Sequence, residues 1–103
     1  MEWVDGALFV NPPANQVLAD TGPVRKGVHR VMLFIWASTG FEAIFERRDA
    51  ANAMTVKAQV LGVVLTNLPF APTVSIETEA NERLRLITRA AVVGEVEASI
   101  FYG

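Results

Sequence analysis

Two acidic residues of one segment are the best candidates for chemistry. Glu42 and Glu46 share one face of the alternating segment 41–47. A carboxylate pair can hydrolyse a glycosidic bond when one member, its pKa raised, acts as the acid. That reaction requires the two groups to face each other across a cleft, whereas here Arg48 is interleaved on the same strand face. We interpret the pair as a solvated strand face and predict no catalytic residue.

Other residue types that support catalysis or ligand binding are sparse. His29 is the one histidine, and it lies in an apolar segment, where histidine is more often packed than catalytic. The serines Ser38, Ser75 and Ser99 lie in strands or at strand ends, outside any nucleophile elbow. No spacing matches a metal site, and the glycines are isolated rather than gathered in a phosphate-binding loop. The sequence therefore predicts no enzyme activity, no metal and no cofactor.

The composition of the chain excludes several classes of chemistry and of partner. The chain has 103 residues, the length of one domain, and no cysteine, which excludes disulfides and thiolate chemistry. Its formal charge of -2 argues against nucleic acid as a partner. The longest apolar run, 31–37, is far shorter than the roughly 20 residues of a membrane-spanning helix, so no membrane partner is expected. The start, 1–5, lacks the features of a signal peptide, so we expect synthesis in a cytoplasm.

The balance of residue types leaves two packing alternatives open. Hydrophobic residues make up 51% of the chain and charged residues only 19%. Such an excess is typical of a well-filled β-sandwich, and equally of a subunit that covers part of its apolar surface in an oligomer or with a partner.

Short β-rich segments separated by turn residues account for most of the chain. Two-residue alternation and β-branched residues predict strands at 16–19, 28–38, 41–47, 55–66, 73–78, 83–91 and 95–102. We expect a turn at 20–23, a corner at 49–53 and a proline-fixed loop at 67–72. The pattern predicts an all-β fold, an antiparallel β-sandwich or jelly roll of about seven or eight strands, with residues 16–103 as a single domain.

One predicted strand, 28–38, is unusual because both of its faces turn apolar after Arg30. A strand of this kind is buried on both sides of its sheet or changes face at a bulge. Both alternatives stay open at the level of sequence.

Residues 1–15 have the composition of an N-terminal arm. Pro12 and Pro13 disfavour regular strand pairing there, while Trp3 and Phe9 are large apolar groups set among polar residues. The segment either folds back on the body as an irregular strand or extends so that its aromatic residues anchor on a neighbouring subunit.

Arginine recurs at strand positions. Arg47 and Arg48 end one predicted strand, and three more arginines occur along 83–89, with glutamates in the C-terminal third of the chain. Guanidinium groups pair well with carboxylates. These charges therefore form either cross-strand pairs within the chain or contacts across a symmetric interface.

Three stretches carry a resemblance to a known group of proteins. They are L-A-D-T-G-P-V at 18–24, F-E-A-I-F-E-R-R-D-A-A-N-A at 41–53 and N-E-R-L-R-L-I-T-R-A-A-V-V-G-E-V-E-A-S-I at 81–100. In pattern they resemble small jelly-roll proteins of tailed bacteriophage virions, the head decoration or cement proteins. The resemblance covers most of residues 15–103.

The resemblance implies a mechanical function. Decoration proteins are often trimers that bind the major capsid protein on the outer capsid surface and tie neighbouring capsomers together. It implies a homotrimer of this chain on a virion, with Arg47, Arg48 and Asn52 at a subunit or capsid contact. Trp3 and Phe9 would then be the anchoring aromatics of the arm.

Two other functions remain open. A phage tail, baseplate or neck component could have the same sandwich, because fold does not settle function. A carbohydrate-binding jelly roll would present exposed aromatics on a platform or in a groove. Trp3, Trp36 and Tyr102 are the only Trp and Tyr residues, and two of them lie in predicted strands, so the sequence offers little material for a glycan contact.

Overall fold

The chain folds into strands joined by loops and turns. A computed structural model describes residues 1–49, 51, 53–63, 71 and 73–103, with the backbone alone for 54–63. The strands are β1 (Glu2–Asp5), β2 (Phe9–Val10), β3 (Val17–Pro23), β4 (Gly27–Ala37), β5 (Phe41–Arg48), β6 (Met54–Val63), β7 (Thr73–Thr78), β8 (Arg83–Thr88) and β9 (Glu95–Tyr102). The seven predicted strands correspond to β3 to β9, and the structure adds β1 and β2 within residues 1–15.

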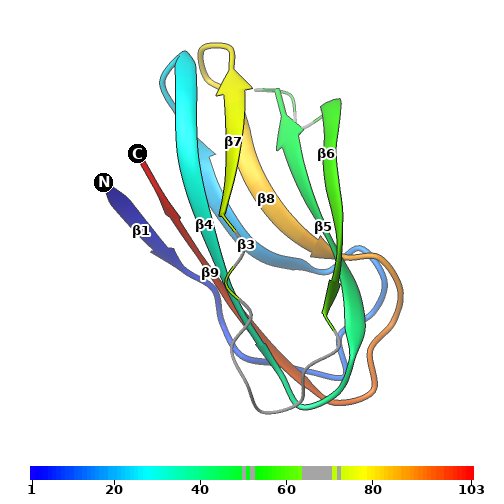
Figure 1. Cartoon of the computed structure of the whole chain (residues 1–103). Coiled ribbons are helices and arrows are strands. Elements are labelled where there is room, and N and C mark those ends of the chain that lie inside the picture. The colour runs from blue at the N-terminus through cyan, green and yellow to red at the C-terminus, as the bar shows by residue number, and fades with distance from the viewer. Residues whose placement is uncertain (50, 52, 64–70, 72) are drawn as a thin grey trace.

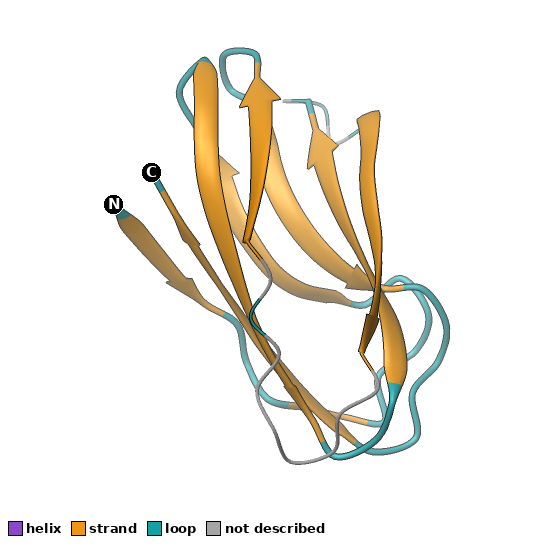
Figure 2. Cartoon of the chain, viewed as in Figure 1, coloured by secondary structure: helices purple, strands orange, loops and turns teal. Residues whose placement is uncertain are grey.

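Two antiparallel sheets pack face to face (Figures 1 and 2). Sheet A has the order β1-β9-β4-β7, with β2 also paired to β9, and sheet B has the order β3-β8-β5-β6. Most neighbours in a sheet are distant in sequence, so the chain crosses repeatedly between the two layers, as in jelly rolls. The predicted all-β antiparallel sandwich is confirmed.

The core lies between the sheets, built from the inward residues of alternating strands. Its largest members come from β3, β4, β5, β8 and β9, namely Leu18, Leu33, Ile35, Phe45, Leu84, Leu86 and Ile100, each at most 2% exposed. Burial of each such side chain contributes about 1.5–3 kcal/mol. This core fixes which residues of every strand point outward.

Strand β4 has one core face and one outer face. Val31, Leu33 and Ile35 are buried, whereas Met32, Phe34 and Trp36 are only half-buried. Its pairing with β7 and β9 runs without a register shift. The expectations of a strand buried on both sides or shifted at a bulge are therefore wrong, and three large apolar residues lie on the outside of sheet A.

The turn predicted at 20–23 is instead an irregular end of β3. The register with β8 shifts between Asp20 and Pro23, and Gly22 adopts a φ of 70°. The Asp20 carboxylate accepts a hydrogen bond from the Gly22 N–H at 2.8 Å. Asp20 and Gly22 take the turn-like arrangement that the sequence suggests, but pairing with β8 continues as far as Pro23, so the segment remains part of the strand.

Part of the predicted middle of the chain lies outside the described residues. These are residues 64–66 of the strand predicted at 55–66, most of the loop predicted at 67–72, and Asn52. The predicted corner is closed at its ends, where Asp49 N donates to Ala53 O at 3.0 Å and Asp49 Oδ1 accepts from Ala53 N at 2.9 Å.

The N-terminal segment runs along β9 of the same chain (Figure 1). Glu2 to Asp5 pair with Tyr102 to Ser99, and Phe9 pairs with Val96. Gly6 directly follows β1, and its N–H donates to Ala98 O of β9 at 2.8 Å. A Cβ on Gly6 would meet Ala98 O at 2.4 Å and Leu18 O at 2.0 Å, so the absence of a side chain permits this close approach.

Candidate functional site

The outer face of sheet A carries a group of large apolar side chains. Trp3, Phe101 and Met32 form one row across β1, β9 and β4, because their backbones are register partners. Phe34 lies opposite Ser99 in the next outer row, and Trp36 lies beyond it on β4. We call the set of Trp3, Met32, Phe34, Trp36 and Phe101 the aromatic face.

Three of its rings form a cluster. The ring centroids of Trp3 and Phe34 are 5.0 Å apart with planes inclined at 44°, and those of Trp3 and Phe101 are 5.7 Å apart at 51°. Such tilted pairs contribute about 0.5–1.5 kcal/mol beyond their burial. Trp3 nevertheless remains 50% exposed. The rings therefore form an uneven apolar surface rather than a coplanar platform.

Polar groups within the aromatic face are bonded to one another. The carboxylate of Asp5 accepts hydrogen bonds from the indole N–H of Trp3 and from the Ser99 hydroxyl, the latter at 3.0 Å. Glu97 and Arg30 are exposed at its margins. Trp3 and Ser99 are thus bonded to Asp5, and charged side chains lie at the margins of the apolar rings.

Shallow hollows break this surface. One of about 240 Å³ is lined by Arg30, Met32, Thr73 and Phe101 among others. Another, of about 130 Å³, lies against Phe34, Trp36, Glu97 and Ser99. These hollows make the aromatic face uneven.

The predicted anchoring aromatics occupy different sides of sheet A. Trp3 belongs to the aromatic face, whereas Phe9 is half-buried and packs against the core between the sheets. The structure therefore does not bring these two residues together.

The predicted interface arginines make contacts within the chain. Arg47 Nε lies 3.2 Å from Glu82 Oε1, and its Nη1 donates to Glu77 O at 2.5 Å. Arg48 Nε donates to Glu46 Oε1 at 2.7 Å. Both ion pairs lie within the chain, but Arg48 and Glu46 belong to the same strand, β5, and Glu82 precedes β8, so neither is one of the expected cross-strand pairs. The assignment of Trp3, Phe9, Arg47, Arg48 and Asn52 to an intersubunit contact stays a prediction, with Asn52 outside the described residues.

Sequence reasoning missed most of the aromatic face. Met32, Phe34 and Trp36 were expected to be buried or to change face, and Phe101 was not connected with them. The available signal was the apolar character of both faces of 28–38 together with an outward phenylalanine on 95–102. Because β4 pairs with β9, these apolar residues lie side by side on the outside of sheet A.

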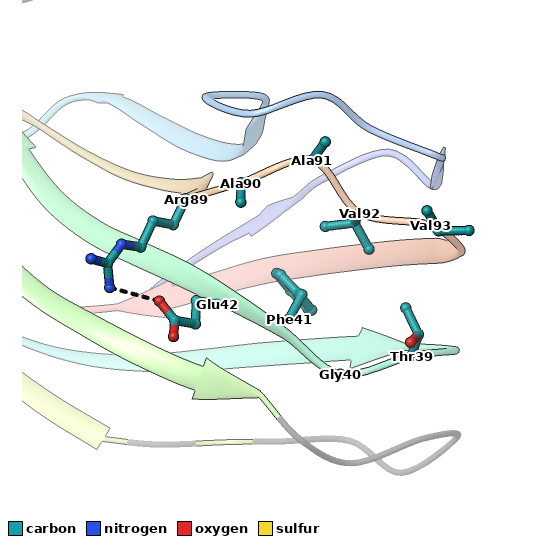
Figure 3. A pocket seen from close by; sticks show the side chains of 9 residues that line it. All are labelled: Thr39, Gly40, Phe41, Glu42, Arg89, Ala90, Ala91, Val92 and Val93. Atoms are coloured by element: carbon teal, nitrogen blue, oxygen red, sulfur yellow. Dashed lines mark hydrogen bonds and ion pairs between the residues drawn. The ribbon is translucent and has the colours of Figure 1, made fainter.

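A pocket of about 420 Å³ opens at one end of the sandwich, between the β4–β5 turn and the segment 89–93 (Figure 3). Phe41 and Val92 line its apolar part. At its other side Arg89 Nη1 pairs with Glu42 Oε2 at 2.7 Å, with both side chains more than half exposed. We call it the end pocket. The Arg89–Glu42 pair is exposed and satisfied within the chain, so it offers little to orient a reacting group in the pocket.

A second pocket, of about 460 Å³, lies where β1, β9 and the β3–β4 turn meet. Its lining includes Glu2, Arg25, His29 and Tyr102. Burial, reinforced by the Glu2 carboxylate, raises the pKa of the Tyr102 hydroxyl above its usual value. We call it the His29 pocket.

Glu42 and Glu46, the possible catalytic pair, have separate partners. Glu42 is exposed and pairs with Arg89, whereas Glu46 is 1% exposed and pairs with Arg48 and Arg85. Within the described part of the chain, no group of three or more His, Asp or Glu side chains is placed to hold a metal ion. The same residues contain no helix able to cross a membrane.

Comparison with known proteins identifies the fold. No protein-family model matches the chain. No curated protein matches it in sequence either. Among solved structures, the globular domain of zebrafish complement 1qA superposes with a TM-score of 0.59 at 7% identity, over 98% of this chain and 96% of that one.

Two further structures extend the comparison. An enzymatically active domain of bacteriophage CBA120 tailspike protein 4 gives a TM-score of 0.58 at 11% identity, over 88% of this chain but only 14% of that chain. The C-terminal domain of EclA, described as a sugar-binding protein, gives a TM-score of 0.57 at 12% identity, over 95% of this chain and 76% of that one. At these identities the likeness concerns the fold alone. The class is thus the jelly-roll β-sandwich module.

Proposed function

We propose that the chain is a non-enzymatic structural protein of a bacteriophage virion, a decoration subunit that binds the major capsid protein on the outer capsid surface. In this proposal its aromatic face is the docking surface. Each bound copy adds contact area across a boundary between capsomers, and many weak contacts act together to resist opening of the shell.

The observation that carries the proposal is the pair of hydrogen bonds that Trp3 and Ser99 donate to Asp5 on the outside of sheet A. Asp5 accepts from both Trp3 and Ser99, so a partner can cover the rings without leaving those donors unsatisfied. Removing apolar surface from water contributes about 25 cal/mol per Å². Half-exposed tryptophan at the centre of such a face is typical of the residues that dominate binding energy.

The virion assignment is supported by sequence pattern. The stretches 18–24, 41–53 and 81–100 resemble decoration proteins, and the described fold is the jelly roll that this resemblance implies. A homotrimer belongs to the same proposal. Light scattering of the purified chain should then give a mass near three times 11.2 kDa.

Co-sedimentation with capsids tests the proposal. The purified chain is mixed with expanded capsids that lack it, and the bound fraction is measured against concentration. We expect saturable binding that Trp3→Ala weakens at least tenfold, because truncation removes the central ring. Val93→Ala is the matched control, since Val93 is also an exposed apolar residue, at 86%, but lies at the end pocket.

Two results would overturn the proposal. One is an absence of saturable binding by the unaltered chain. The other is equal weakening by Trp3→Ala and Val93→Ala, which would show that the aromatic face has no special part. Binding to purified tails or baseplates rather than heads would support the structural alternative of a tail, baseplate or neck component.

Carbohydrate binding is a second candidate, favoured by the exposed indole of Trp3 beside the carboxylate of Asp5. An exposed indole can stack on a sugar ring, and the similar EclA domain is described as sugar-binding. The tilted rings and the Trp3–Asp5 hydrogen bond favour a protein partner. Retention of the chain on insoluble polysaccharide, lost in Trp3→Ala, would favour the carbohydrate candidate.

A further inference from the structure

A small hollow on the outer side of sheet A lies between aromatic rings and a carboxylate. Its lining includes Phe34 and Trp36 of β4 together with Glu97 and Ser99 of β9. These residues meet because the two strands are paired, with Phe34 opposite Ser99 and Trp36 opposite Glu97. At about 130 Å³ the hollow is well below the roughly 300–1,000 Å³ of small-molecule sites, so it suits the head group of a single side chain. We call it the Trp36 hollow.

The Glu97 carboxylate is the polar group that this hollow leaves available. Glu97 is exposed, and within the part of the chain that the structure describes it forms no ion pair. The hydroxyl of Ser99, the other polar side chain of the lining, already donates to Asp5 at 3.0 Å. A ligand that completes the hollow is therefore one that Glu97 can bind, a cationic hydrogen-bond donor.

The charges nearby also favour a cation. Asp5 and Glu95 place two further carboxylates on the same side of sheet A as Glu97. The arginine on this side of β4, Arg30, precedes Trp36 by six residues, which is about 20 Å at roughly 3.3 Å per residue. That separation exceeds the Debye length of about 8 Å at physiological ionic strength, so Arg30 offsets these carboxylates little.

The aromatic lining distinguishes between the two common cationic side chains. A guanidinium is planar, so it stacks on an aromatic ring while its fork of N–H groups donates to a carboxylate. An ammonium is compact and strongly hydrated, and it lacks this planar fork. Phe34 and Trp36 are half-buried, so each side chain is held by its neighbours and still partly accessible. Two rings and one carboxylate at a single hollow therefore fit arginine better than lysine.

We propose that the Trp36 hollow receives an arginine side chain of the partner protein, with its guanidinium stacked on Trp36 and hydrogen-bonded to Glu97. This rests on the docking role proposed above for the aromatic face, and it names the chemistry of the partner residue. Trp3 at the centre of the face supplies apolar contact area. Glu97 at one margin fixes the orientation of the partner, because charge pairs contribute specificity more than affinity.

NMR of the indole N–H groups tests the hollow without a capsid. The chain has two tryptophans, so a Trp3→Phe variant assigns the Trp36 resonance by elimination. The probes are N-acetyl-arginine amide and N-acetyl-lysine amide, each titrated through the millimolar range into the nitrogen-labelled full chain at one ionic strength. We expect the arginine probe to move the Trp36 indole and the backbone amide of Glu97 saturably, with an affinity about fivefold or more above that of the lysine probe.

Substitutions localise the response to the hollow. Glu97→Gln keeps the size of the side chain and removes its charge, so it should weaken binding of the arginine probe about fivefold or more. Glu95→Gln is the matched control, because Glu95 is exposed on the same side of β9 but does not line the hollow. Trp36→Leu should also weaken binding, since it removes the ring and keeps an apolar side chain. The two exposed glutamates keep the comparison valid if Trp36→Leu does not fold.

Co-sedimentation with expanded capsids relates the hollow to docking. Blocking the capsid arginines with phenylglyoxal should weaken binding of the unaltered chain and of Glu95→Gln, with little further effect on Glu97→Gln. Acetylation of the capsid lysines should affect all three chains alike. A loss that depends on both Glu97 and the capsid arginines isolates the pairwise contact, as in a double-mutant cycle.

Three outcomes of the titrations would overturn the proposal. The first is a Trp36 resonance that the arginine probe does not move saturably, or that the lysine probe moves with equal affinity. The second is equal weakening by Glu97→Gln and Glu95→Gln. The third is a response to methyl β-D-glucoside but not to the arginine probe, which would make the hollow a sugar contact.

The capsid experiment separates this inference from the proposed function. Full capsid binding by Glu97→Gln, together with weakened binding by Trp3→Ala, would overturn the arginine contact and leave the docking role of the aromatic face intact. An arginine-selective Trp36 hollow in a chain that binds no capsid would support the arginine contact and overturn the capsid assignment.

Discussion

The guanidinium of Arg47 lies 3.2 Å, Nε to Oε1, from the carboxylate of Glu82. Arg47 belongs to β5 in sheet B, and its Nη1 also donates to the backbone oxygen of Glu77 on β7 in sheet A. The Glu82 carboxylate accepts in addition from Glu79 N at 2.5 Å. One arginine therefore joins the two sheets to the β7–β8 turn.

This relationship predicts a clear loss of stability in Arg47→Leu. The Glu82 side chain is 6% exposed and the Arg47 side chain 19%, so removal of the cation leaves a largely buried carboxylate poorly compensated. We expect a decrease of about 2–3 kcal/mol in the free energy of unfolding, measured by urea denaturation. Lys26→Leu is the control, because the Lys26–Glu79 pair is 68% and 64% exposed and should contribute less than about 1 kcal/mol. Equal decreases in the free energy of unfolding of both variants would contradict the role of Arg47 in joining the two sheets.

Two glutamates of β5 provide a matched comparison of buried and exposed pairs. Glu46 is 1% exposed and its Oε1 contacts Arg48 Nε at 2.7 Å and Arg85 Nε at 3.4 Å, whereas the Glu42–Arg89 pair is mostly exposed. Glu46→Gln should cost about 3 kcal/mol of unfolding free energy because it removes the charge that compensates two arginines. Glu42→Gln should cost less than about 1 kcal/mol. Thermal and urea unfolding of both variants measure this difference. Similar losses of unfolding free energy in the two variants would show that burial of the Glu46 pair does not increase its contribution.

Gly6→Ala should detach the N-terminal strand. The new Cβ would lie 2.0 Å from Leu18 O and 2.4 Å from Ala98 O, and because both atoms belong to the backbone, β1 must move away from β9. We expect faster amide hydrogen exchange in residues 2–5 and a red shift of the Trp3 emission as its ring leaves Phe34 and Phe101. Ala7→Ser, at an exposed neighbouring position, is the control. Unchanged exchange in Gly6→Ala would show that the segment tolerates the side chain.

The single tyrosine gives a pH dependence that can be followed alone. Burial and the nearby Glu2 carboxylate raise the pKa of Tyr102 above its ordinary value of 10.0. The folded chain thus holds the phenolic proton more tightly than the unfolded chain. This contribution to stability is fully present below pH 10 and is lost as the pH rises through the folded pKa.

Absorbance of the phenolate measures that pKa during alkaline titration. Glu2→Gln should move it part of the way back, because the charge of Glu2 is the smaller of the two causes. Asp49→Asn is the control, since Asp49 lies at the β5–β6 corner. A Tyr102 pKa at or below the ordinary value would contradict the described burial of the ring.

Sequence reasoning predicted the seven main strands because alternation is a local property. In β7 and β9, for example, the inward residues Ile76 and Val96 alternate with polar neighbours, so period and face can be assigned from the strand itself. The same reasoning failed for β4, where Phe34 and Trp36 are apolar but face outward. Hydrophobicity alone does not distinguish a residue buried in a core from one on the outward face of a sheet.

The candidate site, too, was only partly predictable from the sequence. Trp3 was singled out from sequence as an anchoring residue, and it lies at the centre of the aromatic face. Its companions Phe34 and Phe101 were not foreseen as a cluster, because they come from β4 and β9. The hollow between Trp36 and Glu97 was likewise beyond reach, since it depends on the pairing of β4 with β9.

By itself, the sequence determined the class of fold, the positions of strands β3 to β9, and the absence of disulfide and thiolate chemistry. Each of these follows from composition or from the two-residue period of a strand. The tertiary structure decided which strands are neighbours: that β1 pairs with β9, which sets Trp3 beside Phe34, and that Arg47 meets Glu82. The physical reason is that backbone hydrogen bonds are alike for any two strands, so partner choice depends on packing of the whole core.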